Sequence, residues 1–246
     1  MESKLFIIIQ ARMTSTRLPK KVMLPLCNKS VLEIMIQRLS SFHKHIIIAT
    51  TDDGSEQKII EMCEQLNIRY FKGSTDNVLQ RYYLAAKNFG AQDTDIIVRL
   101  TSDCPLIDEN IVKNIIEFYK NNNFDYASNT IQRSFPRGMD TEVFSFKCLH
   151  TAYEKASLDF EKEHVTQYIN NSHKEEFTQG QYVDKKDNSK YRLTLDEELD
   201  YQAICEIYKL FYCQLNFTYK ELINLLEENP YLYEINKSIE QKKVGQ

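Results

Sequence analysis

The stretch LFIIIQARMTSTRLPKKV, residues 5–22, decides the fold, because an apolar run of strand length leads directly into a loop with four cations and no acid. Residues 5–9 are apolar and mostly β-branched, which favours a buried strand. Loops at the carboxyl ends of parallel strands line the ligand crevice of α/β proteins. We therefore expect the loop to hold phosphate oxygens, which form strong charge-assisted hydrogen bonds with arginine and lysine; the alternative is a solvated basic loop without a ligand. The four cations are Arg12, Arg17, Lys20 and Lys21.

Short β-rich runs alternate with amphipathic segments through the first half of the chain, which is typical of βαβ units and a largely parallel sheet. The expected strands are residues 5–9, 45–50, 68–71, 95–100 and 191–195, and the expected helices lie within 30–42, 54–67, 76–89 and 108–122, with two more within 147–170 that are broken near Leu158. Thr218 and Glu221 match the capping-box spacing of a last helical part. From about residue 124 to 190 the pattern loosens, which predicts a small inserted lobe. Residues 1–246 are therefore expected to form one α/β domain, a mostly parallel mixed sheet flanked by helices.

The composition argues against several classes of protein. A net charge of −4 and a pI near 5.8 do not suit a surface for nucleic acid or anionic lipid. No run of about 18 apolar residues could span a bilayer, and the N-terminus lacks a secretory pattern, so we expect a cytoplasmic protein without nucleic-acid or membrane partners. The six glycines form neither GxGxxG nor GxxxxGKS/T, which argues against a dinucleotide oxidoreductase or P-loop ATPase. The six cysteines are scattered without a CxxC pair, so we expect reduced thiols, with neither a zinc site nor a disulfide framework.

Two aspartates lie where an expected strand ends. Asp103 follows the strand 95–100, and Asp196 follows the strand 191–195, with Asp200 one helical turn further on. Two carboxylates facing a cationic loop are what a magnesium-bound nucleoside triphosphate needs, since Mg²⁺ prefers oxygen ligands and bridges phosphates. The alternatives are that Asp196 caps the following helix and that Asp103 fixes the turn before Pro105.

Six stretches occur in order along the chain: IIQARMTSTRLPKKV, FKGSTDNVLQRYYLAA, VRLTSDCPLID, RGMDTEVF, EKEHVTQYI and RLTLDEELDY. Together they resemble the cytidylyltransferase family that includes the spore coat polysaccharide biosynthesis type and is related to the CMP-Kdo and CMP-sialic acid synthetases. EENPYLYEIN near the C-terminus matches as well, so the resemblance covers nearly the whole chain. It implies a Rossmann-like nucleotide-diphospho-sugar transferase fold. It also implies transfer of CMP from CTP to a nonulosonic or other 3-deoxy-2-keto sugar acid, with release of pyrophosphate, for surface polysaccharide biosynthesis.

The resemblance also implies roles for single residues. The phosphate-binding positions of the family fall on Arg12, Ser15, Arg17 and Lys21, its Mg²⁺ ligands on Asp103 and Asp196, and a position near the base on Thr101. Arg12, Lys21 and Asp103 are expected to be catalytic. Relatives form dimers through the inserted lobe, so we expect a homodimer. The chain has Lys20 and Ser102 where relatives usually carry glycine, a residue that positive φ or close backbone approach would favour.

Candidates for binding the acceptor lie in two other motifs. Ser74, Asp76 and Arg81 in GSTDNVLQRYY could lie beside the sugar, although residues 74–76 could equally be only a helix start. In RGMDTEVF, Asp140 and Glu142 could bind sugar hydroxyls and Arg137 could meet an acceptor carboxylate; the alternative is a salt-bridged hairpin. His164, next to Glu163, could be a general base or a structural histidine. Cys104 has no partner histidine and is not expected to be a nucleophile.

Two other functions stay open. One is a nucleotidyltransferase that uses another nucleoside triphosphate and a sugar phosphate, although such enzymes commonly have a glycine-rich form of the basic loop. The other is a catalytically silent nucleotide-binding homologue, which Lys20 and Ser102 make conceivable and which retention of both aspartates argues against.

Overall fold

The structure, a computed structural model, describes residues 3–241. Its strands are β1 (Leu5–Ala11), β2 (Pro25–Leu26), β3 (Lys29–Ser30), β4 (Ile46–Thr51), β5 (Arg69–Gly73), β6 (Ile96–Thr101), β7 (Tyr126–Ser128), β8 (Glu142–Ser145) and β9 (Gln179–Gln181). Its α-helices are α1 (Val31–Arg38), α2 (Gln57–Gln65), α3 (Val78–Asn88), α4 (Glu109–Lys120), α5 (Phe146–Lys155), α6 (Asp159–Glu163), α7 (Glu198–Leu210), α8 (Tyr219–Glu228) and α9 (Tyr231–Asn236). Short helical turns of other types are η1 (Lys21–Met23), η2 (Ser40–His45), η3 (Tyr168–Ser172) and η4 (Lys174–Glu176). None of the helices within residues 3–241 is both long and apolar enough to cross a membrane.

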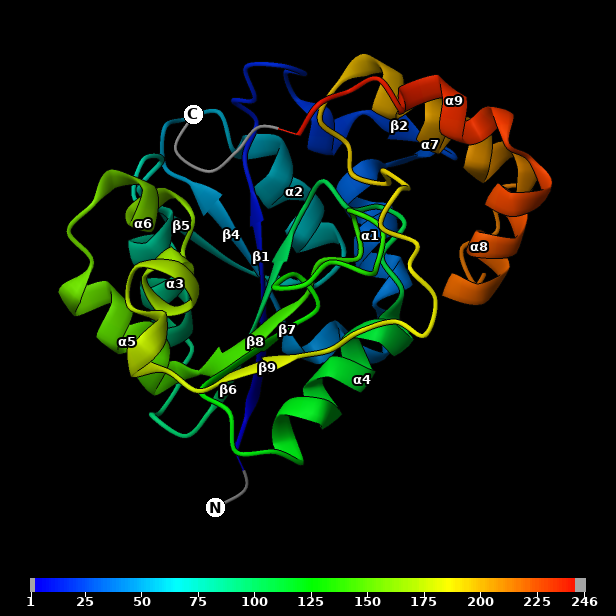
Figure 1. The fold of residues 1–246 in the computed structure, drawn as a ribbon. Coiled ribbons are helices and arrows are strands. Elements are labelled where there is room, and N and C mark those ends of the chain that lie inside the picture. The colour runs from blue at the N-terminus through cyan, green and yellow to red at the C-terminus, as the bar shows by residue number, and fades with distance from the viewer. Residues whose placement is uncertain (1–2, 242–246) are drawn as a thin grey trace.

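One seven-stranded sheet organises the molecule, in the order β5-β4-β1-β6-β8-β7-β9 (Figure 1). β5, β4, β1 and β6 are parallel, whereas β8 runs antiparallel to both β6 and β7. The mostly parallel mixed sheet is therefore confirmed, as are the four strands expected in the first half of the chain. The carboxyl ends of the parallel strands meet at one edge, at the top of Figure 1.

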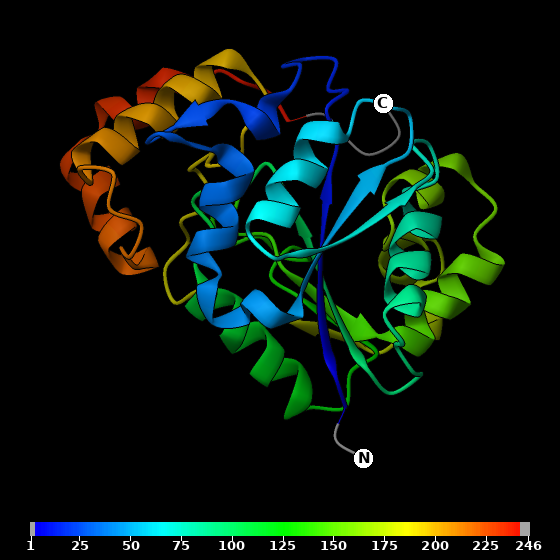
Figure 2. The ribbon, with the colours of Figure 1, turned by 180° about the vertical axis from the view of Figure 1, so that it is seen from behind.

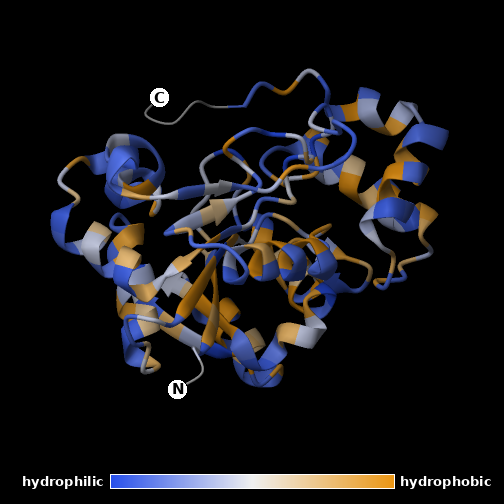
Figure 3. Ribbon diagram, turned by 60° about the horizontal axis from the view of Figure 1, so that its bottom comes forward, coloured by the Kyte–Doolittle hydropathy of each residue, from blue (hydrophilic) through white to orange (hydrophobic). Residues whose placement is uncertain are grey.

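The sheet is buried on both faces, and β1 shows how its sequence produces this. Ile7 and Ile9 belong to a core covered by α1, α2, α4, α7, α8 and α9, whereas Phe6 and Ile8 point into a second core covered by α3, α5 and η3. The views from front and back show these two groups of helices on opposite sides of the sheet (Figures 1 and 2). A continuous apolar strand is expected for a sheet buried on both faces. Hydrophobic residues accordingly gather on the strands and inner helix faces, with hydrophilic residues outside (Figure 3).

The segment expected to form an inserted lobe is continuous with the main sheet. It supplies β7, β8 and β9, while α5 and α6 pack against α3. The break near Leu158 is confirmed, because α5 ends at Lys155 and α6 begins at Asp159. The capping box of Thr218 and Glu221 is also confirmed at the start of α8.

The prediction of a strand at residues 191–195 is wrong. This segment is extended but makes only an isolated bridge, between Arg137 and Arg192, outside the named strands. The reason is its partners: the amide of Leu193 donates to the carbonyl of Arg137, and that of Leu195 donates to the carbonyl of Asp103 at 2.7 Å. These partners lie in loops, so β-rich composition identified an extended segment but not a place in the sheet.

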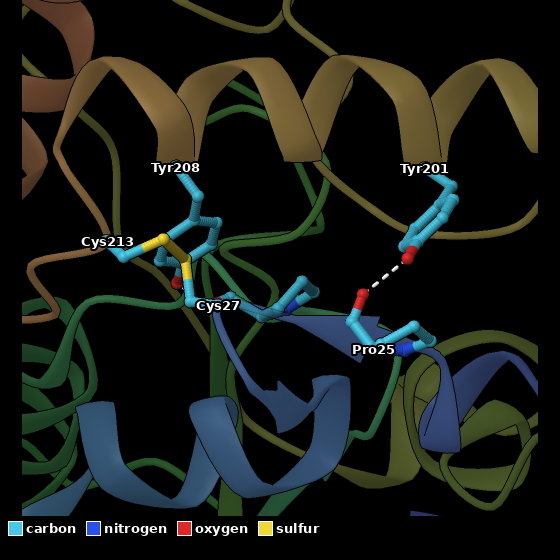
Figure 4. The surroundings of a disulfide bond; sticks show 6 residues. Pro25, Cys27, Tyr201, Tyr208 and Cys213 are labelled. Carbon is cyan, nitrogen blue, oxygen red and sulfur yellow. Dashed lines mark hydrogen bonds between the residues drawn. A yellow bond between two sulfur atoms is a disulfide. The ribbon is translucent and has the colours of Figure 1, made fainter.

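The expectation of six reduced thiols is wrong for one pair of cysteines. Cys27, in the turn between β2 and β3, forms a disulfide with Cys213, just past α7 (Figure 4). The two are 186 residues apart, so no spacing in the sequence signals the bond. The hydroxyl of Tyr201 on α7 also donates to the carbonyl of Pro25, so α7 holds the β2–β3 hairpin at two points. Cys63, Cys104, Cys148 and Cys205 are free thiols.

Candidate active site

The basic loop between β1 and η1 is anchored by its apolar residues. Met13 and Val22 are buried, and the amide of Lys20 donates to the carbonyl of Met13 at 3.0 Å, which closes the loop. The hydroxyl of Ser15 accepts from the amide of Leu18 at 3.5 Å. The apolar anchors therefore fix the backbone of the loop that carries the four cations.

Lys20 has φ 60° and ψ 20°, in the left-handed region. Only glycine adopts this conformation routinely, and other residues lose roughly 1–2 kcal/mol there. A glycine at this position in relatives thus has a physical reason. Ser102 differs, because it has no positive φ; it is buried, and its amide donates to the carbonyl of Gln10 at 3.2 Å, which ties the end of β6 to β1.

Lys21, Asp103 and Asp196 form the centre of the site. The Lys21 Nζ atom lies 2.8 Å from Asp103 Oδ2 and 2.8 Å from Asp196 Oδ1. Asp103 follows β6, and the bond from the Leu195 amide to the Asp103 carbonyl brings the segment that carries Asp196 beside it. Three segments distant in sequence thus place an ammonium group between two carboxylates.

Further cations hold Asp196 in place. Arg17 lies 2.9 Å from Asp196 Oδ1, and Arg192 lies 3.1 Å from Asp196 Oδ2. Arg192 also binds both oxygens of Asp200, which is fully buried and accepts from the amides of Asp196 and Glu197. Arg17, Lys21 and Arg192 thus face the carboxylates of Asp103, Asp196 and Asp200, and Arg17 also lies 3.5 Å from Glu197.

Sequence reasoning missed Arg192 and gave no role to Asp200. Both are spaced at intervals of four residues about Asp196, and that spacing of opposite charges is the signal that could have found them.

The pKa values of the central pair follow from these contacts. Burial lowers the pKa of Lys21, but Asp103 and Asp196 outweigh it, so the net pKa is raised. Burial raises the pKa of Asp103, but the charge and hydrogen bond of Lys21 outweigh it and the net pKa is lowered. Both groups are therefore charged at neutral pH.

The donor set suits a hard divalent cation that is held together with a substrate. Asp103 and Asp196 both bind the Lys21 ammonium through carboxylate oxygens, so both could bind one cation in its place. Within residues 3–241 no group of three or more His, Cys, Asp or Glu side chains forms a cage for a metal ion. Mg²⁺ is commonly bound by one or two carboxylates plus phosphate oxygens, so these residues fit it.

Three other residues singled out from the sequence lie at or just after the carboxyl ends of β1 and β6. Arg12 is exposed directly after β1 and makes no ion pair with the cluster in the described part of the chain. Thr101 is half-buried at the end of β6, with its hydroxyl 3.4 Å from the Cys104 sulfur. Cys104 is buried, and burial raises the pKa of its thiol well above the ordinary value, which does not suit a nucleophile.

The predicted acceptor residues Ser74 and Arg81 lie together. Arg81 is only 1% exposed and donates to the carbonyl of Ser74 at 2.7 Å. The Ser74 hydroxyl accepts from the amide of Asn77, the N-cap of α3, as expected for a helix start. Burial lowers the pKa of Arg81, and the nearby charge of Arg12 lowers it further. Arg81 therefore holds the loop of Ser74 through the hydrogen bond to its carbonyl, and its side chain is too deeply buried to contact an acceptor directly.

The acidic residues of RGMDTEVF are salt-bridged. Asp140 accepts two hydrogen bonds from Arg133, at 2.6 and 2.8 Å, and Glu142 lies 2.6 Å from Arg99 across the β6–β8 pair. Glu142 is 7% exposed, so it holds the sheet together and does not face solvent.

Gly138, in the same motif, has φ +101°, and a Cβ there would lie 2.5 Å from the Leu193 carbonyl oxygen. Only glycine lets the 137–138 backbone approach the segment that positions Asp196 this closely.

His164 ends α6 and is half-buried. Burial lowers its pKa, so it is neutral at neutral pH. The helix that it follows, α6, packs against α3 on the sheet face that also carries α5 (Figure 1).

The family model for cytidylyltransferases matches residues 6–239. The chain belongs to the cytidylyltransferase family. This cytidylyltransferase is 32% identical over 233 residues to the spore coat polysaccharide biosynthesis protein SpsF of Bacillus subtilis. The aligned residues cover 91% of this chain and 94% of SpsF. A solved cytidylyltransferase from Leptospira borgpetersenii is 34% identical, with a TM-score of 0.89 over 98% of this chain and 100% of the other. A 3-deoxy-manno-octulosonate cytidylyltransferase of Psychromonas ingrahamii is 30% identical over 156 residues, 62% of this chain and 58% of that protein.

These findings confirm the predicted family, the Rossmann-like α/β fold and the class of enzyme, a nucleotidyltransferase. They place the Lys21 cluster and the basic loop in an enzyme rather than in an unrelated fold with a charged surface.

Proposed function

We propose that this cytidylyltransferase transfers CMP from CTP to a sugar acid and releases pyrophosphate. The observation that carries the proposal is the position of the Lys21 ammonium, 2.8 Å from both Asp103 and Asp196, beside a basic loop at the carboxyl edge of the sheet. Crevices at this edge are where open α/β sheets bind ligands. The name of the Psychromonas relative supports a 3-deoxy-2-keto sugar acid as the acceptor.

In the proposed reaction a hydroxyl of the sugar acid attacks the α-phosphorus of CTP. Arg12, Arg17 and Lys21 neutralise the charge that develops on the phosphate oxygens, and preorganised cations of this kind act most strongly in the transition state. Lys21 has a flexible stem, so its ammonium can turn from the two carboxylates to the phosphates. Ser15 and Thr101 offer hydroxyl groups at the edges of the nucleotide site.

Asp103 and Asp196 are the residues that would hold Mg²⁺. When bound with phosphate oxygens, the ion supplies charge neutralisation and lowers the pKa of the attacking hydroxyl. Arg17 and Arg192 keep Asp196 oriented for this role. We also propose a cytoplasmic homodimer that pairs through the region around β7, β8 and β9.

The test is pyrophosphate release with Mg²⁺ and CTP against a panel of eight-carbon and nine-carbon 2-keto sugar acids, repeated with UTP, ATP and GTP. Release with CTP and one acid supports the proposal. Release with another triphosphate and a sugar phosphate would replace it, and CTP binding without any release would leave a silent nucleotide-binding homologue.

Two variants assign the roles. Arg12→Ala and Asp103→Asn should each lower kcat by about 10²-fold or more without unfolding the protein. The matched control is Asp93→Asn, because Asp93 is exposed before β6 at the opposite end of the sheet. Wild-type rates for both site variants would reject the proposed roles.

A further inference from the structure

A hollow of about 110 Å³ lies beside the Lys21 cluster, between residues 189–192 and the chain that follows α9. Its charged lining within the described part of the chain is entirely cationic: Arg137, Lys190, Arg192 and Lys237. The other lining residues are uncharged, with Ser189 and Asn236 among them. A concave site that gathers positive charge and excludes carboxylates attracts small anions.

Two of these cations are already neutralised. Arg192 binds Asp196 and Asp200, as described above. Lys237 pairs with Glu234 one turn earlier on α9. They help to shape the hollow, but they do not give it a net charge.

Arg137 and Lys190 carry the excess charge. Neither forms an ion pair within 4.0 Å among residues 3–241. Burial lowers the pKa of Arg137, and the positive charge of Arg133 lowers it further. Asp140 and Asp196 offset part of this loss, but neither lies within 4.0 Å of the Arg137 guanidinium, so an anion in the hollow would stabilise it further.

Arg137 and Lys190 line the same hollow, and the structure fixes both of their segments. The Arg137 amide donates to the Tyr191 carbonyl at 3.2 Å, and the Leu193 amide donates to the Arg137 carbonyl at 2.8 Å, so the two segments are fixed side by side. The Lys190 ammonium lies 4.8 Å from the centre of the Tyr191 ring, a cation–π contact that restrains an otherwise mobile side chain. Fixed cations bind an anion at a lower entropic cost than mobile ones.

We propose that this hollow binds a small oxyanion, either a carboxylate or a phosphate group, with Arg137 and Lys190 as its charged ligands. Two sources of this chemistry are possible: an anionic group on the acceptor, which rests on the function proposed above, or free phosphate. In either case Arg192 links the hollow to the catalytic carboxylates, because the same guanidinium lines the hollow and binds Asp196.

The test compares Lys190→Glu with Lys185→Glu. Lys185 is the matched control because it is exposed in the same segment but does not line the hollow. Inorganic phosphate is titrated in the presence of saturating CTP, which fills the basic loop, and binding is read from the rise in the thermal unfolding temperature. Lys190→Glu should weaken phosphate binding at least about tenfold, the loss expected for one charge-assisted contact, and Lys185→Glu should not.

The second readout, the KM for the sugar acid, separates the two sources. An increase of tenfold or more in Lys190→Glu at unchanged kcat assigns the hollow to the acceptor, whereas an unchanged KM with lost phosphate binding assigns it to free phosphate. Equal behaviour of the two variants in both readouts overturns the proposal. A wild-type enzyme that releases no pyrophosphate would count against the proposed function alone, because the phosphate titration needs no turnover.

Discussion

Reduction of the Cys27–Cys213 disulfide should strongly lower the stability of the protein. The bond joins residues 186 positions apart, from the β2–β3 hairpin to the end of α7. In the chain-entropy model a cross-link that closes a loop of this length restricts the unfolded chain by about 5 kcal/mol. The whole free energy of unfolding of a domain is roughly 5–15 kcal/mol, so the expected loss is a large part of it.

The assay is urea unfolding followed by circular dichroism, with and without a phosphine reductant. Wild type should lose about 5 kcal/mol on reduction, whereas the double variant Cys27→Ser/Cys213→Ser should start low and not respond to reductant. Cys205→Ser is the control that keeps the bond, since Cys205 is a free thiol on α7, and it should respond as wild type does.

A thiol titration of the unfolded, unreduced protein decides whether the bond exists. Four reactive thiols are expected, and six would refute the bond itself. With four thiols present, a loss below about 1 kcal/mol on reduction would refute the loop-entropy reasoning. Turnover should change less than stability, because Lys21 keeps its own contacts with Asp103 and Asp196.

Two further predictions concern the basic loop. Lys20→Gly should raise the free energy of unfolding by up to about 1 kcal/mol, because glycine has no steric cost at φ 60°, and a loss of stability in urea unfolding would contradict this. The second concerns pH: because Lys21 holds the folded pKa of Asp103 below its unfolded value, Asp103 stabilises the fold above the unfolded pKa and loses this contribution as pH falls through the folded pKa. Wild type should therefore lose about 2 kcal/mol between roughly pH 5 and pH 2 from this pair, and Lys21→Met should lose less. Equal acid sensitivity of the two proteins would exclude Lys21 as the cause.

The strands of the first half could be predicted because their information is local. An apolar, β-branched run such as residues 5–9 reports both its conformation and its burial. The segment 191–195, YRLTL, also contains residues common in strands, but its amides bond to loops, because composition does not identify the partner of a segment. The disulfide was out of reach for the same reason, since Cys27 and Cys213 are brought together only by the packing of α7 against the β2–β3 hairpin.

Asp103 and Asp196 were correctly predicted to lie close together, but the reason given for Asp196 was wrong. The rule that carboxyl ends of parallel strands meet at one edge holds for Asp103, which follows β6. Asp196 does not follow a strand of the sheet; its place is set by the bond from the Leu195 amide to the Asp103 carbonyl and by the close approach of Gly138 to Leu193. The two carboxylates lie together because one loop is hydrogen-bonded to the other.

The charge balance of the site follows from this loop pairing. The bridge between Arg137 and Arg192 belongs to the same extended segment that carries Asp196, so one stretch of backbone positions both the carboxylate and the guanidinium that orients it. Asp200 then neutralises the second half of the Arg192 fork from the first turn of α7. Because Arg17 and Arg192 also bind Asp196, the ammonium of Lys21 can leave this carboxylate without releasing it. The proposed exchange of this ammonium for a metal ion and phosphates depends on that freedom.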